Sequence, residues 1–93
     1  MVIGACEIKL QIYEANSLKE KRHTVKSLIG RLKSRFNISI AEIGLYDSWQ
    51  TSIIGFACVT NDSQHANGII SKVLKFVDGD SRLEILDYNI EIL

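Results

Sequence analysis

Hydrophobic and polar residues alternate at both ends of the chain. From Val2 to Tyr13, the polar residues Glu7, Lys9 and Gln11 share one side and apolar residues lie between them. The segment from Leu83 to Leu93 alternates in the same way. Its apolar side consists of Leu86, Tyr88, Ile90 and Ile92. A period of two is typical of a strand with one buried face, so we predict a half-buried β-strand for each segment.

Two segments repeat hydrophobic residues at helical spacing. The first follows Ser17 and Glu20, which have the spacing of a capping box, and its pattern ends at Asn37, so we predict a helix of about 18 residues. Its apolar stripe consists of Leu18, Val25, Leu28, Ile29, Leu32 and Phe36. The second helix is predicted between the polar cluster at 61–63, a typical N-cap sequence, and the Asp78-Gly79-Asp80 stop. Its apolar stripe consists of Ala66, Ile69, Ile70, Val73, Leu74 and Val77.

Two further strands are predicted between the helices. The segment from Ile38 to Leu45 changes the parity of its apolar residues, which a β-bulge near Ala41–Glu42 would explain. The segment from Thr51 to Thr60 is apolar on both faces, and the residues between the two strands, 46–50, have turn composition. The element order is therefore strand, helix, strand, strand, helix, strand.

This order predicts an α+β, ferredoxin-like βαββαβ fold. Right-handed connections place the first and third strands at the centre of a four-stranded antiparallel sheet, with both helices on one face. A chain of 93 residues with 46% hydrophobic residues is expected to form a single domain over residues 1–93. Its longest apolar run, Ile53 to Val59, is much shorter than a membrane span, and no secretory signal precedes the first strand. We therefore expect a cytoplasmic protein with no membrane partner.

Several short motifs along the chain carry a family resemblance. They are Ser17–Arg22, Arg31–Leu32, Phe36–Asn37, Ala41–Glu42 and Trp49–Gln50. At this spacing the chain resembles the YlxP-like family of small bacterial proteins, whose function is unknown. The resemblance implies a ferredoxin-like fold, and because members often lie near genes for transcription and translation factors, it implies association with RNA or the ribosome. Leu45-Tyr46 stands where the pattern has a His-Gln pair, so no role of that imidazole carries over.

Zero net charge hides a separation of charge along the chain. Residues 17–35 hold seven bases and one acid, Glu20, for a net charge of +6, and the rest of the chain has a net charge of −6. On a helical wheel the bases flank the apolar stripe, and a crest of Ser27, Gly30 and Ser34 lies between the flanks. Such a helix can approach a phosphate backbone closely, although charged residues also serve simply as a solvated helix face. The predicted phosphate-contacting residues are Lys19, Lys21, Arg22, Lys26, Arg31, Lys33 and Arg35.

The turn between the second and third strands carries two aromatic residues. Tyr46 and Trp49, with Gln50 beside them, are predicted to contact a partner protein or stack on bases, since such side chains lose few rotamers on contact. The alternative is that the turn folds back over the edge of the core or over the partner of a dimer.

The sheet face away from the helices is predicted to be partly apolar. Its apolar residues are Ile3, Ala5, Ile53, Ala57 and Val59. Because an open sheet seldom leaves such a surface to water, we expect a second copy of the chain to cover it and form a symmetric homodimer.

The residues that usually carry chemistry do not form a recognisable catalytic or metal site. His23 and His65 lack metal-ligand neighbours and are expected to be solvated. Cys6 and Cys58 lie on the two central strands, either as small buried hydrophobic residues or within disulfide reach. Glu42 interrupts an apolar strand, where it either points to water or pairs with a base from the first helix. We therefore expect no enzyme activity and no cofactor.

The predicted function is that of a non-enzymatic accessory protein that binds RNA or a ribosomal surface through its first helix. Two alternatives remain open. One is a protein–protein interaction module that docks on an acidic partner, and the other is a dimeric regulator that binds a small molecule.

Overall fold

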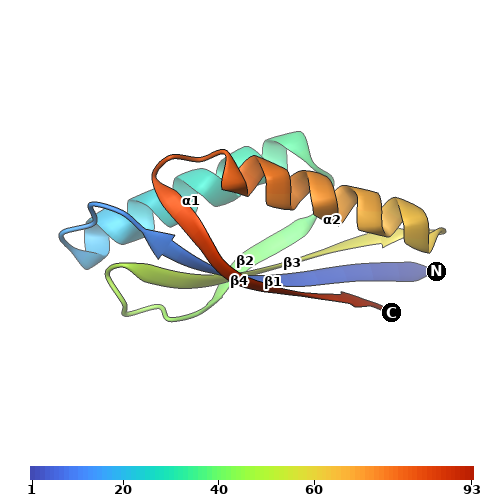
Figure 1. Cartoon of the computed structure of the whole chain (residues 1–93), viewed down its shortest axis with the longest axis horizontal. Helices are drawn as coiled ribbons and strands as arrows, with labels where there is room; N and C mark the ends of the chain where they lie inside the picture. The colour runs from blue at the N-terminus through green and yellow to red at the C-terminus, as the bar shows by residue number, and fades with distance from the viewer.

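The computed structural model describes residues 1–93 without a gap and contains the six elements in the predicted order. They are β1 (Val2–Ile12), α1 (Leu18–Arg35), β2 (Ser39–Gly44), β3 (Thr51–Thr60), α2 (Ser63–Asp78) and β4 (Leu83–Ile92). The strands form one antiparallel sheet in the order β2-β3-β1-β4, and both helices cover the same face of it (Figure 1). The ferredoxin-like fold is therefore confirmed, with β1 and β3 at the centre.

The helix ends agree with the polar residues that predicted them. Ser17 caps α1 by accepting a hydrogen bond from the backbone N–H of Glu20 at 3.1 Å, while the Glu20 carboxylate accepts one from the N–H of Asn16 at 2.6 Å. Asp62 caps α2 by accepting from the N–H groups of Gln64 and His65. These bonds satisfy N–H groups that have no partner within a helix.

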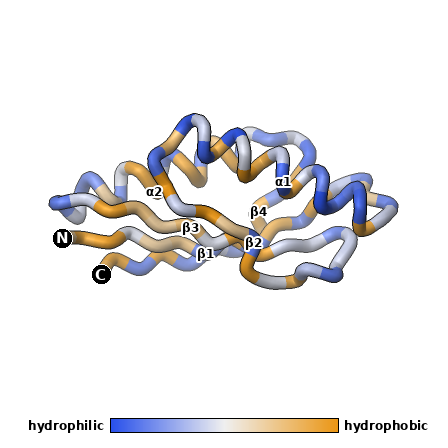
Figure 2. The backbone as a smooth tube through the Cα atoms, turned by 180° about the vertical axis from the view of Figure 1, so that it is seen from behind, coloured by the Kyte–Doolittle hydropathy of each residue, from blue (hydrophilic) through white to orange (hydrophobic).

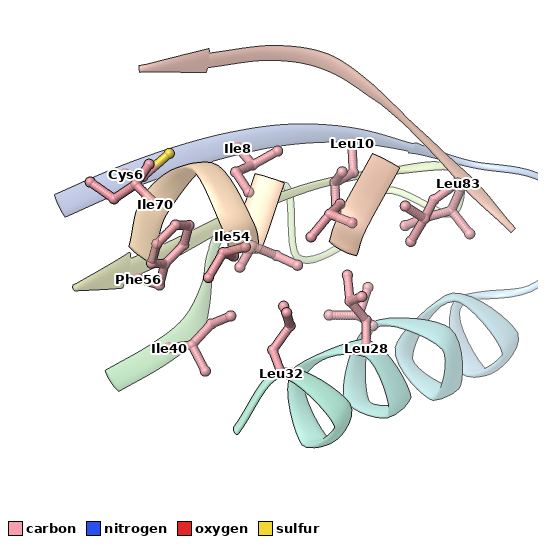
Figure 3. Close-up of a cluster of buried hydrophobic side chains, with 14 of the residues drawn as sticks. Cys6, Ile8, Leu10, Leu28, Leu32, Ile40, Ile54, Phe56, Ile70 and Leu83 are labelled. Atoms are coloured by element: carbon pink, nitrogen blue, oxygen red, sulfur yellow. The ribbon is translucent and has the colours of Figure 1, made fainter. Parts of the chain in front are cut away.

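The core lies between the sheet and the two helices, whose facing segments carry hydrophobic residues (Figure 2). Apolar side chains of both layers meet there (Figure 3). Leu28 and Leu32 of α1 and Ile70 of α2 are fully buried against the sheet face that carries Ile8 and Leu10. Gly4 allows α2 to approach β1 closely, because a Cβ atom there would lie 3.1 Å from the Ala66 Cβ. The alternation of β1 has thus placed its apolar side under the helices.

Two β-bulges, one in β2 and one in β4, interrupt the alternation of side chains between the two faces of the sheet. In β2 the register shifts between Glu42 and Gly44, one residue beyond the predicted position. In β4 it shifts between Ile85 and Asp87, so the expectation of regular alternation through Leu86 is wrong. Leu83 and Ile85 pair with the core side of β1, the unpaired Leu86 is 46% exposed, and alternation resumes at Asp87. The first part of β4, before the bulge, reaches the core through Leu83 and Ile85, and the rest of β4 is exposed although it stays paired with β1.

No helix in the structure is long and apolar enough to span a membrane.

Candidate nucleic-acid interface

One side of α1 presents four cations to solvent. Lys19, Arg22, Lys26 and Lys33, which we call the basic flank, are all exposed. Arg22 has an acid near it, but Arg22 Nη2 and Asp47 Oδ1 are 3.9 Å apart and both side chains are largely exposed, so this pair neutralises little charge. The other three make no salt bridge. The basic flank therefore carries a mostly uncompensated positive charge.

The crest beside the basic flank is partly as predicted. Gly30 is exposed, and a Cβ atom added there would have no neighbour within 4 Å. Ser27 and Ser34 are engaged within the protein: Ser27 Oγ accepts from Arg82 Nη1 at 3.3 Å, and Ser34 Oγ donates to the Arg31 carbonyl at 2.9 Å. The bare backbone at Gly30 therefore leaves room for a phosphate backbone to approach the helix closely. The hydroxyl groups of Ser27 and Ser34 already have partners within the protein.

Lys21 does not belong to the exposed cations, and its predicted contact with phosphate is wrong. Its side chain is completely buried, and its ammonium lies 2.7 Å from Glu42 Oε2. The reason is its place on the helix: Lys21 is four residues before Val25 and seven before Leu28, so all three lie on the buried stripe. The structure thus favours the pairing of Glu42 with a base from α1 over the alternative in which Glu42 points to water.

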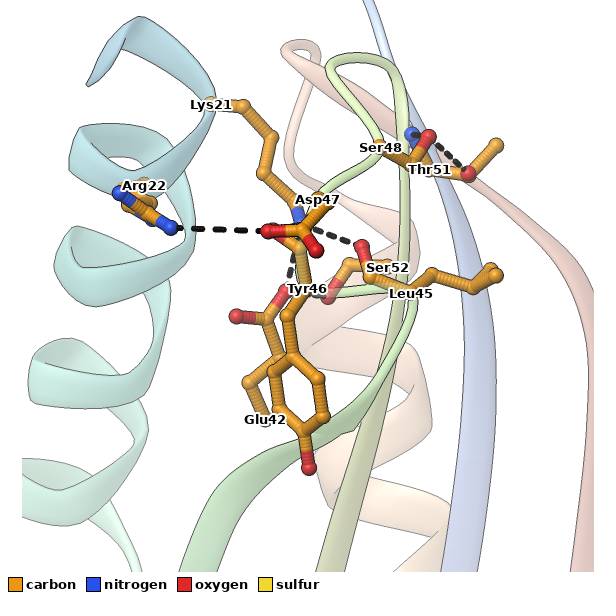
Figure 4. A network of polar contacts seen from close by, with 9 residues as sticks. All are labelled: Lys21, Arg22, Glu42, Leu45, Tyr46, Asp47, Ser48, Thr51 and Ser52. Atoms are coloured by element: carbon orange, nitrogen blue, oxygen red, sulfur yellow. Dashed lines mark hydrogen bonds and ion pairs between the residues drawn. The ribbon is translucent and has the colours of Figure 1, made fainter. Parts of the chain in front are cut away.

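The buried ammonium also fixes the turn between β2 and β3 (Figure 4). Lys21 Nζ donates to the carbonyl groups of Leu45 at 2.9 Å and Tyr46 at 3.3 Å, and Ser52 donates to Glu42 Oε2 at 2.6 Å. Leu45 has a φ of 58°, a left-handed conformation that is unfavourable for a branched side chain. Hydrogen bonds from Lys21 therefore hold a strained turn against the first half of α1.

The aromatic residues of this turn are accessible. Tyr46 is 52% exposed and Trp49 is 54% exposed, so neither side chain is buried in the core. Gln50 is exposed as well, and its backbone carbonyl accepts from Ile12 N at 2.7 Å, which ties the turn to the end of β1. Asp47 of the same turn faces Arg22, so this turn lies next to the first half of the basic flank (Figure 4).

The other predicted cations, Arg31 and Arg35, lie toward α2. Their guanidinium carbons are 5.0 and 5.2 Å from the centre of the Phe76 ring. Lys72 and Lys75 of α2 line a hollow together with Arg35. Sequence reasoning about α1 alone missed these two lysines. The only signal was that α2 carries them on its polar side, and the crossing of the helices was needed to bring them to Arg35.

Arg31 also contacts a carboxylate that is held by Arg82. Asp80 accepts from Arg82 Nε at 3.0 Å and Arg82 Nη2 at 2.8 Å, and Arg31 Nη1 lies 3.4 Å from Asp80 Oδ2. The hydrogen bonds from Arg82 lower the pKa of Asp80, and the charge of Arg31 acts in the same direction. This cluster joins the start of β4 to both helices and is not free to bind an anion.

The cysteines and histidines show no arrangement for chemistry. Cys6 and Cys58 are free, buried thiols on neighbouring strands, and burial raises the pKa of Cys6 to about 11. His23 and His65 are exposed. No group of three His, Cys, Asp or Glu residues is placed to hold a metal ion.

The open face of the sheet has an apolar half and an acidic half. Val59 is 67% exposed, and a shallow hollow of about 280 Å³ lies around Ala5, Gly55 and Ala57, with Ile43 packed over Gly55. The half of this face toward β4 carries an exposed acidic row. This row consists of Glu7, Glu84, Asp87 and Glu91.

Most of the chain is similar in sequence to proteins whose function is unknown. Residues 3–90 match a protein family described as "Protein of unknown function (DUF503)". The chain is 39% identical over 83 residues to "Uncharacterized protein YlxP" of Bacillus subtilis (strain 168), covering 89% of this chain and 90% of that protein. Among solved structures, "De novo designed protein Foldit4" is similar in fold, with a TM-score of 0.52 and 12% identity over 99% of this chain and 94% of that one.

Proposed function

We propose that this chain, which belongs to the DUF503 family of proteins of unknown function, is a non-enzymatic, cytoplasmic RNA-binding protein that contacts the RNA backbone through α1. The observation that carries this proposal is the basic flank: four exposed cations on one side of an 18-residue helix, with no closely held carboxylate among them. Cations in such a row contact successive phosphates and release condensed counterions when they bind.

The length of α1 fits a nucleic-acid backbone. At about 1.5 Å per residue the basic flank, from Lys19 to Lys33, is about 21 Å long, so it reaches several phosphates. The exposed Gly30 leaves a gap in the side chains of the crest, through which a phosphate chain comes close to the helix. Contacts of this kind position RNA and carry no sequence information by themselves.

Tyr46 and Trp49 extend this surface with groups that recognise bases. Both side chains are about half exposed, on a turn that Lys21 holds in place and whose Asp47 lies 3.9 Å from Arg22. A base stacks on an aromatic ring whatever its identity, so these residues favour an unpaired loop or bulge next to the helical part of an RNA. The proposed ligand is therefore a structured RNA, such as a hairpin of ribosomal RNA.

The experiment is a titration of a fluorescent RNA hairpin by fluorescence anisotropy at several salt concentrations. Lys26→Glu should weaken binding about tenfold and lower the slope of log K against log salt by about 1, and adding Arg22→Glu should deepen both effects. Lys9→Glu is the matched control, because it makes the same change in net charge on the opposite sheet face.

Two results would contradict RNA binding. One is equal weakening by Lys26→Glu and Lys9→Glu, which would indicate a general effect of net charge. The other is a partner from cell extract that stays bound after RNase treatment and is lost in Lys26→Glu, which would assign the basic flank to an acidic protein partner.

We also propose that the apolar half of the open face is the interface of a homodimer. Val59, Ile53 and Ala57 form a nearly continuous apolar surface along β3, next to Ile43 and Ala5. A symmetric dimer would bury this surface and leave α1 of both copies on the outer sides, available to RNA.

A further inference from the structure

A groove lies between the end of α1 and the second half of α2. It has a volume of about 430 Å³ and is lined by Arg35, Phe36, Lys72, Lys75 and Phe76. Volumes of about 300–1,000 Å³ are usual for sites that hold small molecules or parts of larger ones. The groove thus combines three cations with two aromatic rings in a space of ligand size.

The three cations of the groove are not neutralised within the protein. Arg35, Lys72 and Lys75 are exposed, and none of them makes a salt bridge. Arg35 and Lys75 lie in the last turns of their helices, where a positive charge is favourable to the helix dipole. That effect does not explain why Lys72 faces the same hollow, because it lies further from the helix end. Three like charges around one hollow repel one another, and a bound anion would remove this repulsion.

The aromatic side of the groove consists of two phenyl rings and the guanidinium groups next to them. Phe36 and Phe76 meet edge to face, with ring centres 6.2 Å apart, and both are only partly buried. The guanidinium groups of Arg31 and Arg35 lie over the Phe76 ring. Phenyl rings and guanidinium planes are the surfaces on which proteins stack the bases of single-stranded RNA.

A second hollow adjoins the first and shares two of its residues. It has a volume of about 350 Å³ and is lined by Arg31, Ser34, Arg35 and Phe76. Arg35 and Phe76 therefore stand between two neighbouring spaces, each with positive charge and aromatic surface. Two adjoining spaces that share a guanidinium group and a ring fit a stretch of nucleotide chain, in which phosphates and planar bases follow one another.

We infer that the two hollows, together the α1–α2 groove, hold two consecutive unpaired nucleotides of an RNA strand. Lys72 and Lys75 contact the phosphates, and the bases stack on the guanidinium groups that lie over the Phe76 ring. This inference rests on the RNA binding proposed above, and it adds a single-stranded segment to the RNA that α1 contacts.

The test compares two RNA probes: a blunt hairpin, and the same hairpin with a short single-stranded tail of uridines at its 3′ end. The tail should tighten binding to the unmodified protein about tenfold, a modest gain for stacking of one or two bases. Lys72→Ala with Lys75→Ala should abolish this gain. It should also lower the salt slope by about 1.4 for the tailed probe, at about 0.7 per phosphate of a single strand, and leave the blunt hairpin unaffected.

A second variant separates stacking from charge. Phe76→Leu should reduce the gain from the tail while leaving the salt slope unchanged, since it removes a ring and no cation. Lys9→Glu, whose change in net charge equals that of the double lysine variant, should leave the gain intact. Circular dichroism verifies that each variant is folded.

The outcomes distinguish this inference from the proposed function. If the blunt hairpin binds and the tail adds nothing, or if the gain survives loss of both lysines, the groove does not hold nucleotides although α1 still binds RNA. If neither probe binds, the proposed function fails as well. If the protein binds poly-glutamate more tightly than the tailed probe, the groove would be a site for an acidic protein segment, and the inference would be overturned.

Discussion

The ammonium of Lys21 lies 2.7 Å from Glu42 Oε2, with the lysine side chain completely buried and the glutamate side chain 17% exposed. The pair joins the helix that carries the basic flank to the strand that leads into the aromatic turn. Every buried polar side-chain atom of the protein, including those of this pair, has a hydrogen-bond partner. Removing one partner of such a buried pair lowers the stability of the fold strongly, because the other charge then remains buried without a counter-charge.

We therefore predict strong coupling between Lys21 and Glu42. Glu42→Gln alone should lower the free energy of unfolding by about 3 kcal/mol, since it leaves a buried ammonium without a counter-charge. Lys21→Met should destabilise to a similar degree, and the double variant by about 1–3 kcal/mol less than the sum of the two. Urea unfolding provides the measurement. Additive effects would show that the pair contributes no specific interaction.

The emission of Trp49 should report on the turn, because it is the only tryptophan of the chain. Lys21→Met removes the hydrogen bonds to the Leu45 and Tyr46 carbonyls, so we predict a lower fluorescence anisotropy of Trp49 and faster amide exchange over residues 45–50. Lys26→Ala, which removes an exposed cation from the same helix, should change neither. An unchanged anisotropy in Lys21→Met would mean that the turn keeps its shape without the buried ammonium.

The stability of the protein should depend on pH through Asp80. Its pKa is lowered in the folded state, chiefly by hydrogen bonds from Arg82, so the folded protein binds fewer protons than the unfolded chain just below the ordinary pKa of about 3.9. The stabilisation is complete above that value and is lost as the pH falls through the folded-state pKa. We predict that Asp80→Asn lowers the free energy of unfolding by about 2 kcal/mol at neutral pH, with a difference that shrinks at acid pH.

The matched control for this pH dependence is Asp47→Asn. The Asp47 side chain is 94% exposed and lies 3.9 Å from Arg22, so its loss should have little effect at any pH. Equal pH profiles of Asp80→Asn and the unmodified protein would show that another group sets the acid transition.

The two thiols should be unreactive until the protein unfolds. Cys6 is 2% exposed and Cys58 is 3% exposed, and the raised pKa of Cys6, about 11, leaves almost no thiolate at neutral pH. We predict that iodoacetamide modifies neither residue in the native protein and both in urea, as measured by mass spectrometry. Rapid labelling of the native protein, or a disulfide between them, would contradict this structure of the core.

The proposed dimer predicts a concentration-dependent mass. Sedimentation should show a dimer at micromolar concentration, and Ala57→Glu, at the centre of the apolar half of the open face, should give a folded monomer. Glu91→Lys, on the acidic half, is the control and should leave the mass unchanged. A monomeric unmodified protein would disprove this interface.

Local patterns were sufficient for the fold. The alternation of β1, the capping residues Ser17 and Asp62, and the stop after Asp78 each depend on interactions within a few residues, and each is confirmed. The bulge at Leu86 could not be predicted, because it is a shift in the register between β4 and β1, a property of the pairing between strands.

The candidate site was predictable only where it depends on one helix. The spacing of Lys21 from Val25 indicates a place on the buried stripe. Its positive charge nevertheless led to the prediction that it is exposed and contacts phosphate. The partner that makes burial possible, Glu42, lies on another element. The α1–α2 groove has no local signal at all, because it exists only where Arg35 of one helix meets Lys72 of the other.

The acidic row on the open face and the basic flank of α1 lie on opposite sides of the sheet, so the molecule has an electric dipole across its layers despite its zero net charge. In the field of a polyanion such a molecule rotates before it makes contact, and arrives with its helices foremost. Salt should therefore slow association strongly, beyond its effect on the final contacts. The acidic row would not contact the RNA, but by orienting the molecule it would still affect the fraction of encounters that lead to a complex.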